Sequence, residues 1–590
     1  MMSSHSIKYR RRYEEKVSYI SWRFLLLCIG IGFALICLII RITYLQIINP
    51  EELIKKGDMR SLRIKKDAIT RGMISDREGR KLAVSIMVYA IWADPKIIYE
   101  NGGLSNIERW QALADELSMS LEQVTNKISF DPNSRFVYLA RQVNPSVGEY
   151  ISKLKIDGIF LRKESRRYYP SGPVAAHLIG VTDIDGCGIE GIEKSFNYLL
   201  TGSPGKRIVR KDRYGRVIEN ISSINSNNAH NLVLSINERI QSLVYHELTH
   251  SVIENKAKSG TAILVDVNTG EVLAMTNSPS YNPNNIAGTS AKVMRNHAIT
   301  DAFEPGSTVK PMVIINALNN GIIKINSILN TQPYMINGHK IKDVREYNEL
   351  SIKGILQKSS NVGVSKLALS MSADELVNVY ASFGLGKPTN LGLIGESSGI
   401  FPNKKTRWSK FERATFSFGY GLMVTPLQLA RVYATIGSFG IYRPLSITRI
   451  DLPVSGDRIF PEGIVKTVVR MMESVTLPDN NSSIQSAVKS YRIAIKTGTT
   501  KKVGNNGHYV NQYIAYTAGV APASNPRYAL VVIINEPTAG KYYGGSVSGP
   551  VFRNIIGNVL RITNIKPDAL TSHNVKLVFN KRKENIDDRS

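Results

Sequence analysis

The sequence predicts an α+β protein with a single N-terminal transmembrane helix, an elongated mixed α+β pedestal domain, and a domain built on an antiparallel sheet with flanking helices and a helical lobe. Three observations predict this. An uncharged apolar run fills residues 24–40, a charged and turn-rich region follows it, and the remainder has strand-like runs at both ends with a helical middle. Strands at the two ends of a domain favour one sheet that both ends complete, with the helices packed alongside.

The composition indicates a folded protein with more than one domain. The chain has 590 residues, which is longer than a single hydrophobic core normally supports. It is 43% hydrophobic and 21% charged, as is typical of folded globular proteins. Its net charge is +27, but the basic residues are spread along the chain without a nucleic-acid-binding signature, so no nucleic-acid partner is expected. The three Cys and nine His show no metal-ligand spacing, so neither a metal nor another cofactor is expected.

The apolar run is interpreted as an uncleaved signal anchor. It reads FLLLCIGIGFALICLII, 17 residues, which is near the minimum for a bilayer span. Basic residues before it place the N-terminus in the cytoplasm and the rest of the chain outside. These residues are Lys8, Arg10, Arg11, Arg12, Lys16 and Arg23. Bulky residues after the run leave no small-x-small cleavage site. We therefore predict a cytoplasmic tail over residues 1–23 and an anchor over residues 24–43.

Residues 44–230 are predicted to form the non-catalytic pedestal domain. Short apolar runs alternate there with turn signals and charged motifs, and no catalytic constellation is visible. Its Arg and Glu residues are interpreted as a salt-bridged scaffold. The polar stretch 222–230 marks its end.

Residues 231–577 are predicted to form the sheet domain, and residues 578–590 a disordered polar tail. A strand over residues 232–236 leads into a helix that starts near Asn237. The turn Asn268-Thr269-Gly270 then joins two apolar runs into a hairpin. Strand-like runs return late in the domain, over residues 491–495, 513–520 and 528–534.

Ser307 is the leading candidate for a nucleophile, in the segment Glu304-Pro305-Gly306-Ser307-Thr308-Val309-Lys310-Pro311. Pro305 favours the first turn of a helix. In that turn, free backbone N–H groups and the helix dipole favour negative charge developing near Ser307. Lys310 lies one turn further on, on the same face, and serves as a base if burial and nearby cations leave it neutral. Ser-x-x-Lys alone is weak evidence, because it also occurs at residues 152, 203 and 486.

Two further motifs strengthen the case. Ser359-Ser360-Asn361 begins 52 residues after Ser307, where the Ser359 hydroxyl would pass a proton to a leaving group and the Asn361 amide would hold a substrate amide. Lys496-Thr497-Gly498-Thr499 begins 189 residues after Ser307, at the end of an apolar strand. There Lys496, Thr497 and Thr499 would bind a carboxylate, and Gly498 would let the strand edge lie against a peptide. Backbone N–H groups of Ser307 and Thr499 would form the oxyanion hole.

This trio is shared by penicillin-binding proteins and class A β-lactamases. The whole chain resembles the class B penicillin-binding proteins, which are monofunctional peptidoglycan D,D-transpeptidases. The resemblance includes Arg71-Gly72-x-Ile74-x-Asp76-Arg77-x-Gly79 at the start of the pedestal and Gly188-x-Glu190 near its end. The segments 299–307 and Lys541-Tyr542-Tyr543-Gly544-Gly545 are most similar to the division-specific members of Gram-negative bacteria.

The resemblance implies that Ser307 forms an acyl-enzyme with a peptidoglycan stem peptide, which an amine of a neighbouring stem then attacks, and that β-lactams acylate the same serine. It also implies a SEDS-class glycan polymerase and other division proteins as partners, and a place in the inner membrane at the septum with the catalytic domain in the periplasm. The alternatives are an elongation-specific relative, a membrane-bound β-lactamase or β-lactam sensor, and a catalytically idle scaffold.

Overall fold

The computed structural model shows two compact units, one of residues 1–68 with 203–227 and one of residues 69–202 with 228–590. The structure describes residues 21–48, 50–66, 70–202, 206–212, 217–224, 229–402, 407–452, 454–476, 484–504 and 507–569. The expected disordered tail and all but the last three residues of the expected cytoplasmic tail therefore lie outside the described residues. The predicted domain boundaries stay predictions.

The first unit contains the apolar helix. Its elements are α1 (Ser21–Thr43), the π-helical turn η1 (Tyr44–Ile48), α2 (Pro50–Ser61), β1 (Leu62–Lys66), β6 (Lys206–Lys211) and β7 (Val217–Ile224). The three strands form an antiparallel sheet in the order β1-β6-β7. Within the described part of the chain, Trp22–Ile48 is the one helical segment long and apolar enough to cross a membrane, with a mean hydropathy of 2.8. The 23 residues of α1 alone reach about 35 Å, slightly more than a bilayer core.

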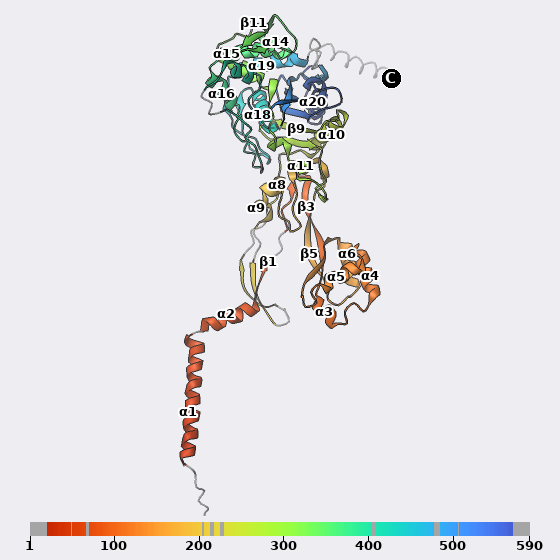
Figure 1. The fold of residues 1–590 in the computed structure, drawn as a ribbon, viewed down its shortest axis with the longest axis vertical. Helices are drawn as coiled ribbons and strands as arrows, with labels where there is room; N and C mark the ends of the chain where they lie inside the picture. Colours follow the sequence, from red (N-terminus) through yellow and green to blue (C-terminus); the bar gives the residue numbers. More distant parts are fainter. Residues whose placement is uncertain are drawn as a thin grey trace, which may run out of the picture. The chain divides into compact units, whose positions relative to one another are not determined.

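The second unit begins with a mixed α+β region (Figure 1). Its sheet is built on the long strand β3, which pairs antiparallel with β5 over ten residues and with β4 at its far end. The strands are β2 (Ile74–Ser75), β3 (Lys81–Ala93), β4 (Val137–Val143), β5 (Ile159–Tyr168) and β8 (Leu232–Val233). The helices are α3 (Pro95–Glu100), α4 (Ile107–Glu116), α5 (Leu121–Ser129), α6 (Pro145–Lys153), α7 (Ala176–Ile179), α8 (Gly191–Ser195) and α9 (Asn197–Thr201), with the 3₁₀ turn η2 (Gly172–Val174). Helices α4, α5 and α6 bury a separate small core against β3.

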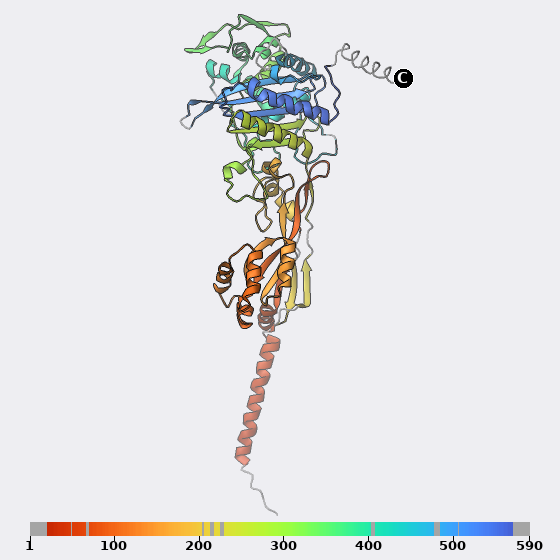
Figure 2. The ribbon, with the colours of Figure 1, turned by 90° about the vertical axis from the view of Figure 1, so that its right-hand side faces the viewer.

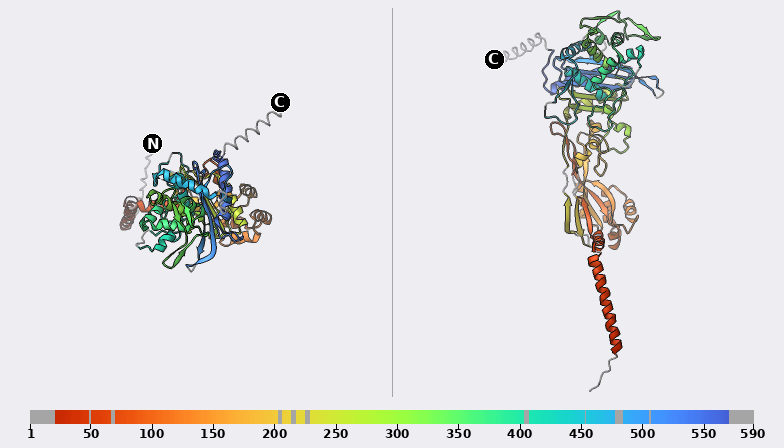
Figure 3. Two further views of the ribbon diagram at one scale, coloured as in Figure 1. Left: turned by 90° about the horizontal axis from the view of Figure 1, so that it is seen from above. Right: turned by 90° about the vertical axis from the view of Figure 1, so that its left-hand side faces the viewer.

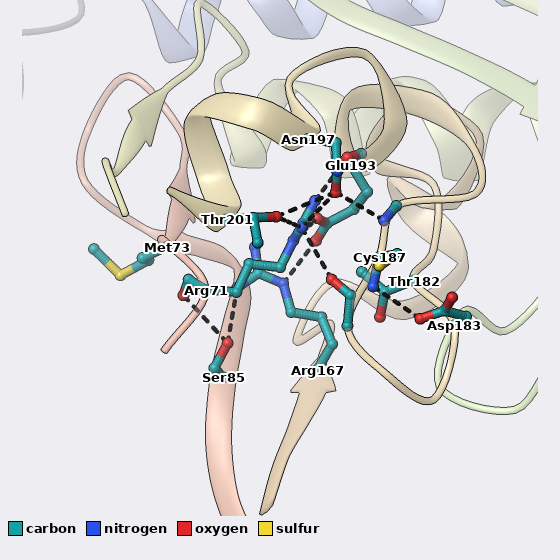
Figure 4. A network of polar contacts seen from close by, with 12 residues as sticks. Arg71, Met73, Ser85, Arg167, Thr182, Asp183, Cys187, Glu193, Asn197 and Thr201 are labelled. Carbon is teal, nitrogen blue, oxygen red and sulfur yellow. Dashed lines mark hydrogen bonds and ion pairs between the residues drawn. The ribbon is translucent and has the colours of Figure 1, made fainter. Parts of the chain in front are cut away.

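A buried ionic network connects Arg71 of the first sequence motif to residues that follow the second motif (Figure 4). The Glu193 carboxylate is fully buried and accepts a 2.6 Å hydrogen bond from Nε of Arg71 and another from Nε of Arg167. The Arg71 guanidinium also reaches the side chains of Asn197 and Thr201, each at 2.7 Å. Pairing and hydrogen bonding make burial of these charges tolerable. Arg167 Nη2 is buried without a hydrogen-bond partner in the described part of the chain. The interpretation of this region as a salt-bridged scaffold agrees with the network.

The predicted antiparallel sheet is confirmed. Five strands lie in the order β10-β9-β19-β18-β17, and the two ends of the domain meet where β9 pairs with β19. The strands are β9 (Ser259–Asp266), β10 (Val272–Ser278), β17 (Ala494–Val503), β18 (Tyr509–Ala521) and β19 (Tyr528–Asn535). The predicted hairpin at Asn268-Thr269-Gly270 is the β9–β10 connection, and the helix predicted near Asn237 is α10 (Glu238–Glu254), which the Asn237 side chain caps. The strand predicted over residues 232–236 is shorter, because Ser235 N–H donates instead to Ile447 C=O.

Helices cover both faces of this sheet, which explains why strands β9, β10 and β19 are buried at almost every position. Helices α10 and α20 (Gly544–Ile562) lie beside each other on one face (Figure 2). Helix α18 (Pro426–Gly437) packs on the opposite face together with the helical lobe.

The helical lobe carries two of the three sequence motifs. Its helical elements are α11 (Ala291–Met294), α12 (His297–Thr300), η3 (Gly306–Val309), α13 (Lys310–Asn319), α14 (Ile352–Lys358), α15 (Asn361–Leu369), α16 (Ala373–Ser382), α17 (Lys410–Phe416), α19 (Glu462–Glu473) and η4 (Ser474–Thr476). The turn η5 (Ile484–Ser486) packs against α20. Its short strand pairs are β11 (Ile328–Asn330) with β14 (Glu349–Ser351), β12 (Tyr334–Ile336) with β13 (His339–Ile341), and β15 (Ile441–Tyr442) with β16 (Asp457–Arg458).

Strand β17 differs from the prediction in a way that matters for the site. The sequence predicts a strand over residues 491–495 with Lys496 at its end, whereas β17 starts at Ala494 and continues to Val503. The polar residues stay in the strand because β18 keeps pairing with them, up to Val503 opposite Tyr509. The resulting hairpin extends past the rest of the sheet (Figure 3). Lys496 and Thr499 therefore lie inside a strand.

Candidate active site

Ser307 lies in the 3₁₀ turn η3, directly before α13, as the Pro-Gly-Ser order suggests. Gly306 has a positive φ of 49°, and a Cβ there would lie 2.2 Å from the buried Tyr516 hydroxyl. Its N–H donates to Gly419 C=O at 3.2 Å. The turn thus packs against two neighbouring segments, a close approach that only glycine allows. Ser307 itself stays partly exposed.

Lys310 is fully buried and reaches the second motif. Its Nζ donates to Ser359 C=O at 2.6 Å, to Asn361 Oδ1 at 2.7 Å and to Ser359 Oγ at 3.3 Å. Ser359 ends α14 in the left-handed conformation, and Ser360 caps α15. This sharp turn brings the Ser359 backbone oxygen and the Asn361 side chain within hydrogen-bond distance of Lys310 Nζ.

Lys496 reaches the same serine from β17. Its Nζ donates to Ser359 Oγ at 2.9 Å and to Thr497 C=O at 3.0 Å, and its side chain is 1% exposed. The Ser359 hydroxyl therefore lies between the two lysines. Three motifs that are far apart in the sequence meet at this one oxygen.

Burial shifts both lysines toward their neutral form. It lowers the pKa of Lys310 well below its usual 10.5, the neighbouring Lys496 lowers it further, and the Asp343 carboxylate opposes the shift. Burial alone lowers the pKa of Lys496 to about 7. A neutral lysine amine has two N–H groups and one lone pair. The short bonds from Lys310 to the Ser359 carbonyl and the Asn361 amide oxygen use both N–H groups, because those oxygens only accept. The lone pair of a neutral Lys310 is then left for a hydroxyl.

Strand β17 lies at the edge of the five-stranded sheet, and in the described part of the chain no strand pairs with its outer side. A Cβ at Gly498 would lie 1.9 Å from the Tyr516 ring, so a side chain is excluded on that face. The Thr499 hydroxyl accepts a hydrogen bond from Gly544 N–H at 2.9 Å, which links β17 to the Tyr542-Tyr543-Gly544 loop. A free edge of this kind is suited to pairing with an extended peptide.

The side chains of Ser307 and Lys310, which the sequence places on one helix face, are not hydrogen-bonded to each other. In the described part of the chain, Ser307 Oγ makes no hydrogen bond to Lys310 or to another residue, and the two residues are joined by the bond from Lys310 N–H to Ser307 C=O. The predicted roles of Ser307, Lys310, Ser359, Asn361 and the Lys496–Thr499 segment remain predictions.

Sequence reasoning misses one charged residue close to the site. Asp343, between β13 and β14, is 8% exposed and accepts hydrogen bonds from Ser360 Oγ at 2.5 Å and from the N–H groups of Asn361 at 2.5 Å and Val362 at 2.9 Å. No pattern around Asp343 distinguishes it from a loop aspartate. Elsewhere, no cluster of three or more His, Cys, Asp or Glu suited to a metal ion occurs among the described residues.

Comparison with known protein families shows which family the chain belongs to. Residues 260–557 match the family described as penicillin binding protein transpeptidase domain, and residues 66–234 match the penicillin-binding protein dimerisation domain. The chain belongs to the class B penicillin-binding proteins. Such a transpeptidase is an acyl-transferring enzyme that binds penicillin and acts on peptidoglycan.

Individual relatives agree with this family. This penicillin-binding protein is 66% identical over 95% of both chains to the peptidoglycan D,D-transpeptidase FtsI of Escherichia coli K12. It is 57% identical to FtsI of Buchnera aphidicola from Schizaphis graminum, over 94% of this chain and 98% of the relative. A crystal structure of a peptidoglycan synthetase from Bifidobacterium adolescentis is 26% identical, has a TM-score of 0.69, and covers 87% of this chain and 98% of its own.

Proposed function

We propose that this class B penicillin-binding protein is the peptidoglycan D,D-transpeptidase of cell division, which cross-links stem peptides of the septal wall through a Ser307 acyl-enzyme. The observation that carries the chemistry is the convergence of Lys310 and Lys496 on the Ser359 hydroxyl, beside the Ser307 turn. The FtsI relatives at 66% and 57% identity support the division role over the elongation-specific alternative.

In the first step, Ser307 Oγ attacks the carbonyl carbon of the penultimate D-Ala. Its proton passes to Lys310, whose lowered pKa supports a neutral amine at the start of the reaction. The negative charge that forms on the carbonyl oxygen is stabilised by the N–H groups of Ser307 and Thr499.

The intermediate then collapses. The C–N bond to the terminal D-Ala breaks, and the leaving nitrogen takes a proton from the Ser359 hydroxyl, which Lys310 replenishes. The substrate carboxylate lies against Lys496 and the hydroxyls of Thr497 and Thr499. An anionic ligand favours the charged form of a lysine whose pKa is about 7. The Asn361 amide and the free edge of β17, with Gly498 at its centre, hold the peptide backbone of the substrate.

In the second step, an amine of a neighbouring stem peptide attacks the ester carbonyl. The new C–N bond replaces the C–O bond, and Ser307 Oγ recovers its proton through the same two residues. A β-lactam takes the place of the donor peptide. Its amide opens, but the amine stays tethered to the acyl group and blocks the acceptor, so the adduct persists.

The apolar segment Trp22–Ile48 supports a single-pass protein of the inner membrane. We place the N-terminus in the cytoplasm, the catalytic domain in the periplasm and the protein at the septum, because of the basic N-terminal residues and the FtsI relatives. A SEDS-class polymerase and other division proteins are the proposed partners, with contacts on the pedestal.

Labelling with a fluorescent penicillin tests the chemistry. We expect one adduct on Ser307, lost in Ser307→Ala and in Lys310→Ala, and stable for much longer than seconds. Turnover within seconds would point to a β-lactamase, and near-normal labelling of Lys310→Ala would contradict the general-base role. A tagged protein should gather at midcell, whereas a side-wall pattern would favour the elongation-specific alternative. Septation supported by Ser307→Ala would favour the idle scaffold.

A further inference from the structure

Glu304 is a half-buried carboxylate, three residues before Ser307, that the proposed reaction does not use. Its Oε1 accepts hydrogen bonds from Gly421 N–H at 3.1 Å and from the Tyr509 hydroxyl at 3.2 Å, and its Oε2 accepts from the same hydroxyl at 3.0 Å. These donors are neutral, and Glu304 forms no ion pair with the described residues. A carboxylate has about four acceptor positions, so Glu304 keeps room for a cation.

Two tyrosine rings lie beside this carboxylate. The ring centroids of Tyr420 and Tyr509 are 6.0 Å apart, with an angle of 80° between the ring planes. Burial and the nearby Glu304 carboxylate raise the pKa of the Tyr420 hydroxyl. Tyr509 is 51% exposed, so solvent reaches the cluster. Because the faces of aromatic rings attract cations, a carboxylate between two such rings is suited to an alkylammonium group.

The cluster lies near the outer end of β17. Tyr509 pairs with Val503, the last residue of that strand, and its hydroxyl reaches back to Glu304. A Cβ at Gly306 would lie 2.7 Å from Thr500 Cγ2, so the turn that joins Glu304 to the nucleophile packs against the same part of the strand. The carboxylate therefore lies near the end of β17 that is opposite to its first residues.

The proposed function gives the direction in which a donor peptide lies along β17. Its terminal carboxylate binds Lys496, near the start of the strand, and Ser307 attacks the carbonyl carbon of the penultimate D-Ala. The earlier residues of the peptide then run along the free edge toward Val503. The residue that precedes the two D-Ala residues therefore has its side chain on the side where Glu304 lies.

The chemistry of the second step indicates which group this side chain carries. That step needs an amine on the neighbouring stem peptide. Peptidoglycan is a repeating polymer, so donor and acceptor stems are alike and the donor carries the same amine. An alkylamine of this kind is an ammonium at pH 7.

We propose that Glu304, Tyr420 and Tyr509 form a cation subsite, which binds the side-chain ammonium of the donor stem peptide on the residue before its two D-Ala residues. This inference rests on the proposed function, because it adds a substrate contact to the same site. The donor is then held by opposite charges at its two ends, with its carboxylate on Lys496 and its ammonium on Glu304.

Two synthetic donors test the subsite. N-acetyl-lysyl-D-alanyl-D-thiolactate carries the ammonium, and its norleucyl counterpart has a side chain of similar length without the charge. Acylation of Ser307 releases the thiol of thiolactate, which a chromogenic thiol reagent detects. The measurement is kcat/KM of the full chain at pH 7. We expect the wild-type chain to favour the lysyl donor by about 5- to 10-fold.

Glu304→Gln removes the charge and keeps an oxygen for Gly421 N–H, so we expect the preference for the lysyl donor to fall below about 2-fold. Tyr509→Phe keeps the ring and removes the hydroxyl that orients the carboxylate, so a preference of about 2- to 3-fold should remain. Glu396→Gln is the matched control. Glu396 is also half-buried and accepts from a hydroxyl, that of Thr389 at 2.6 Å, but it lies between α16 and α17. Its variant should keep the wild-type preference.

Equal kcat/KM values of the wild-type chain for the two donors would overturn the proposal. An unchanged preference in Glu304→Gln would also overturn it. If Glu304→Gln does not melt cooperatively, the exposed position Tyr509 decides, and a full wild-type preference in Tyr509→Phe overturns the proposal. A wild-type chain that releases no thiol and forms no penicillin adduct contradicts the proposed function, whereas a normal adduct with equal donors contradicts only the subsite.

A further arm separates the donor ammonium from that of the acceptor. With the norleucyl donor and D-lysine as the acceptor, the ratio of transferred to hydrolysed product reports how well the acceptor is bound. A donor subsite predicts the same ratio in the wild-type chain and in Glu304→Gln. A lower ratio in Glu304→Gln, together with equal rates for the two donors, would place the acceptor ammonium on Glu304 and overturn the donor subsite.

Discussion

Lys496 Nζ donates a 2.9 Å hydrogen bond to Ser359 Oγ, across 137 residues of sequence. This contact joins the edge strand β17 to the turn between α14 and α15. Lys310, at the start of α13, donates to the same hydroxyl. Ser359 Oγ therefore contacts one lysine from the sheet and one lysine from the helical lobe.

Replacing Lys496 should change both the rate of acylation and its pH dependence. In Lys496→Ala the substrate carboxylate loses the cation proposed to bind it, and we expect acylation to slow by about 10- to 100-fold. Acylation needs neutral Lys310, so its rate rises with pH through the pKa of Lys310, and we call this rise the acid limb. Lys496 lowers that pKa, so removing Lys496 raises the pKa and moves the acid limb to higher pH. The melting temperature should change little compared with the rate. An acid limb that stays in place would argue against coupling between the two lysines.

The buried Lys496 should also make the stability of the fold depend on pH. Its pKa is about 7 in the folded protein and about 10.5 when unfolded, so between these values the unfolded chain binds more protons. Stability from this group therefore rises with pH across that window. We expect Lys496→Met to be more stable than wild type at pH 7, with on the order of 2 kcal/mol of the difference lost by pH 9. Chemical denaturation at both pH values measures this.

Lys292→Met is the control for that measurement, because Lys292 is exposed on α11. Its stability difference from wild type should be the same at pH 7 and pH 9. A pH-independent difference for Lys496→Met as well would contradict the shifted pKa of Lys496.

A side chain at Gly498 should displace β17. The added Cβ of Gly498→Ala would lie 1.9 Å from the buried Tyr516 ring, which cannot move away easily. We expect a loss of about 1–3 kcal/mol in the free energy of unfolding and at least about a 10-fold slower acylation. Gly463→Ala is the control, since nothing lies within 4 Å of its added Cβ, and it should be neutral or stabilising by about 0.5–1 kcal/mol. Equal effects of the two substitutions would show that the Tyr516 contact is unimportant.

Removing Glu193 should destabilise the protein without changing the chemistry. Glu193→Ala leaves the buried guanidinium groups of Arg71 and Arg167 without their carboxylate, at a cost of about 3–5 kcal/mol. Thermal melting measures the loss, and Glu193→Gln should lose less because it keeps one acceptor oxygen. The acylation rate of the folded fraction at 25 °C should stay within about 2-fold of wild type. A large fall in that rate would instead connect the network to the active site.

Much of the fold follows from local patterns. The apolar run near the N-terminus, the Asn268-Thr269-Gly270 turn and the cap at Asn237 each depend on neighbours within a few residues, and the structure has a helix, a hairpin and a helix start at those places. The lengths of β8 and β17 do not follow from local patterns, because the strand that pairs with each of them comes from a distant segment of the chain.

The chemistry divides in the same way. The sequence by itself determined which side chains are available for acyl transfer, because Ser307, Lys310 and the two later motifs have recognisable types and spacing. Only the tertiary structure decided that Ser359 Oγ lies between two buried lysines, and that Asp343 anchors the turn that holds one of them. These contacts join segments up to 137 residues apart, and burial there shifts the lysine pKa values. The residues next to each lysine predict neither its distance to Ser359 Oγ nor its burial, because both arise only when the sheet and the helical lobe pack together.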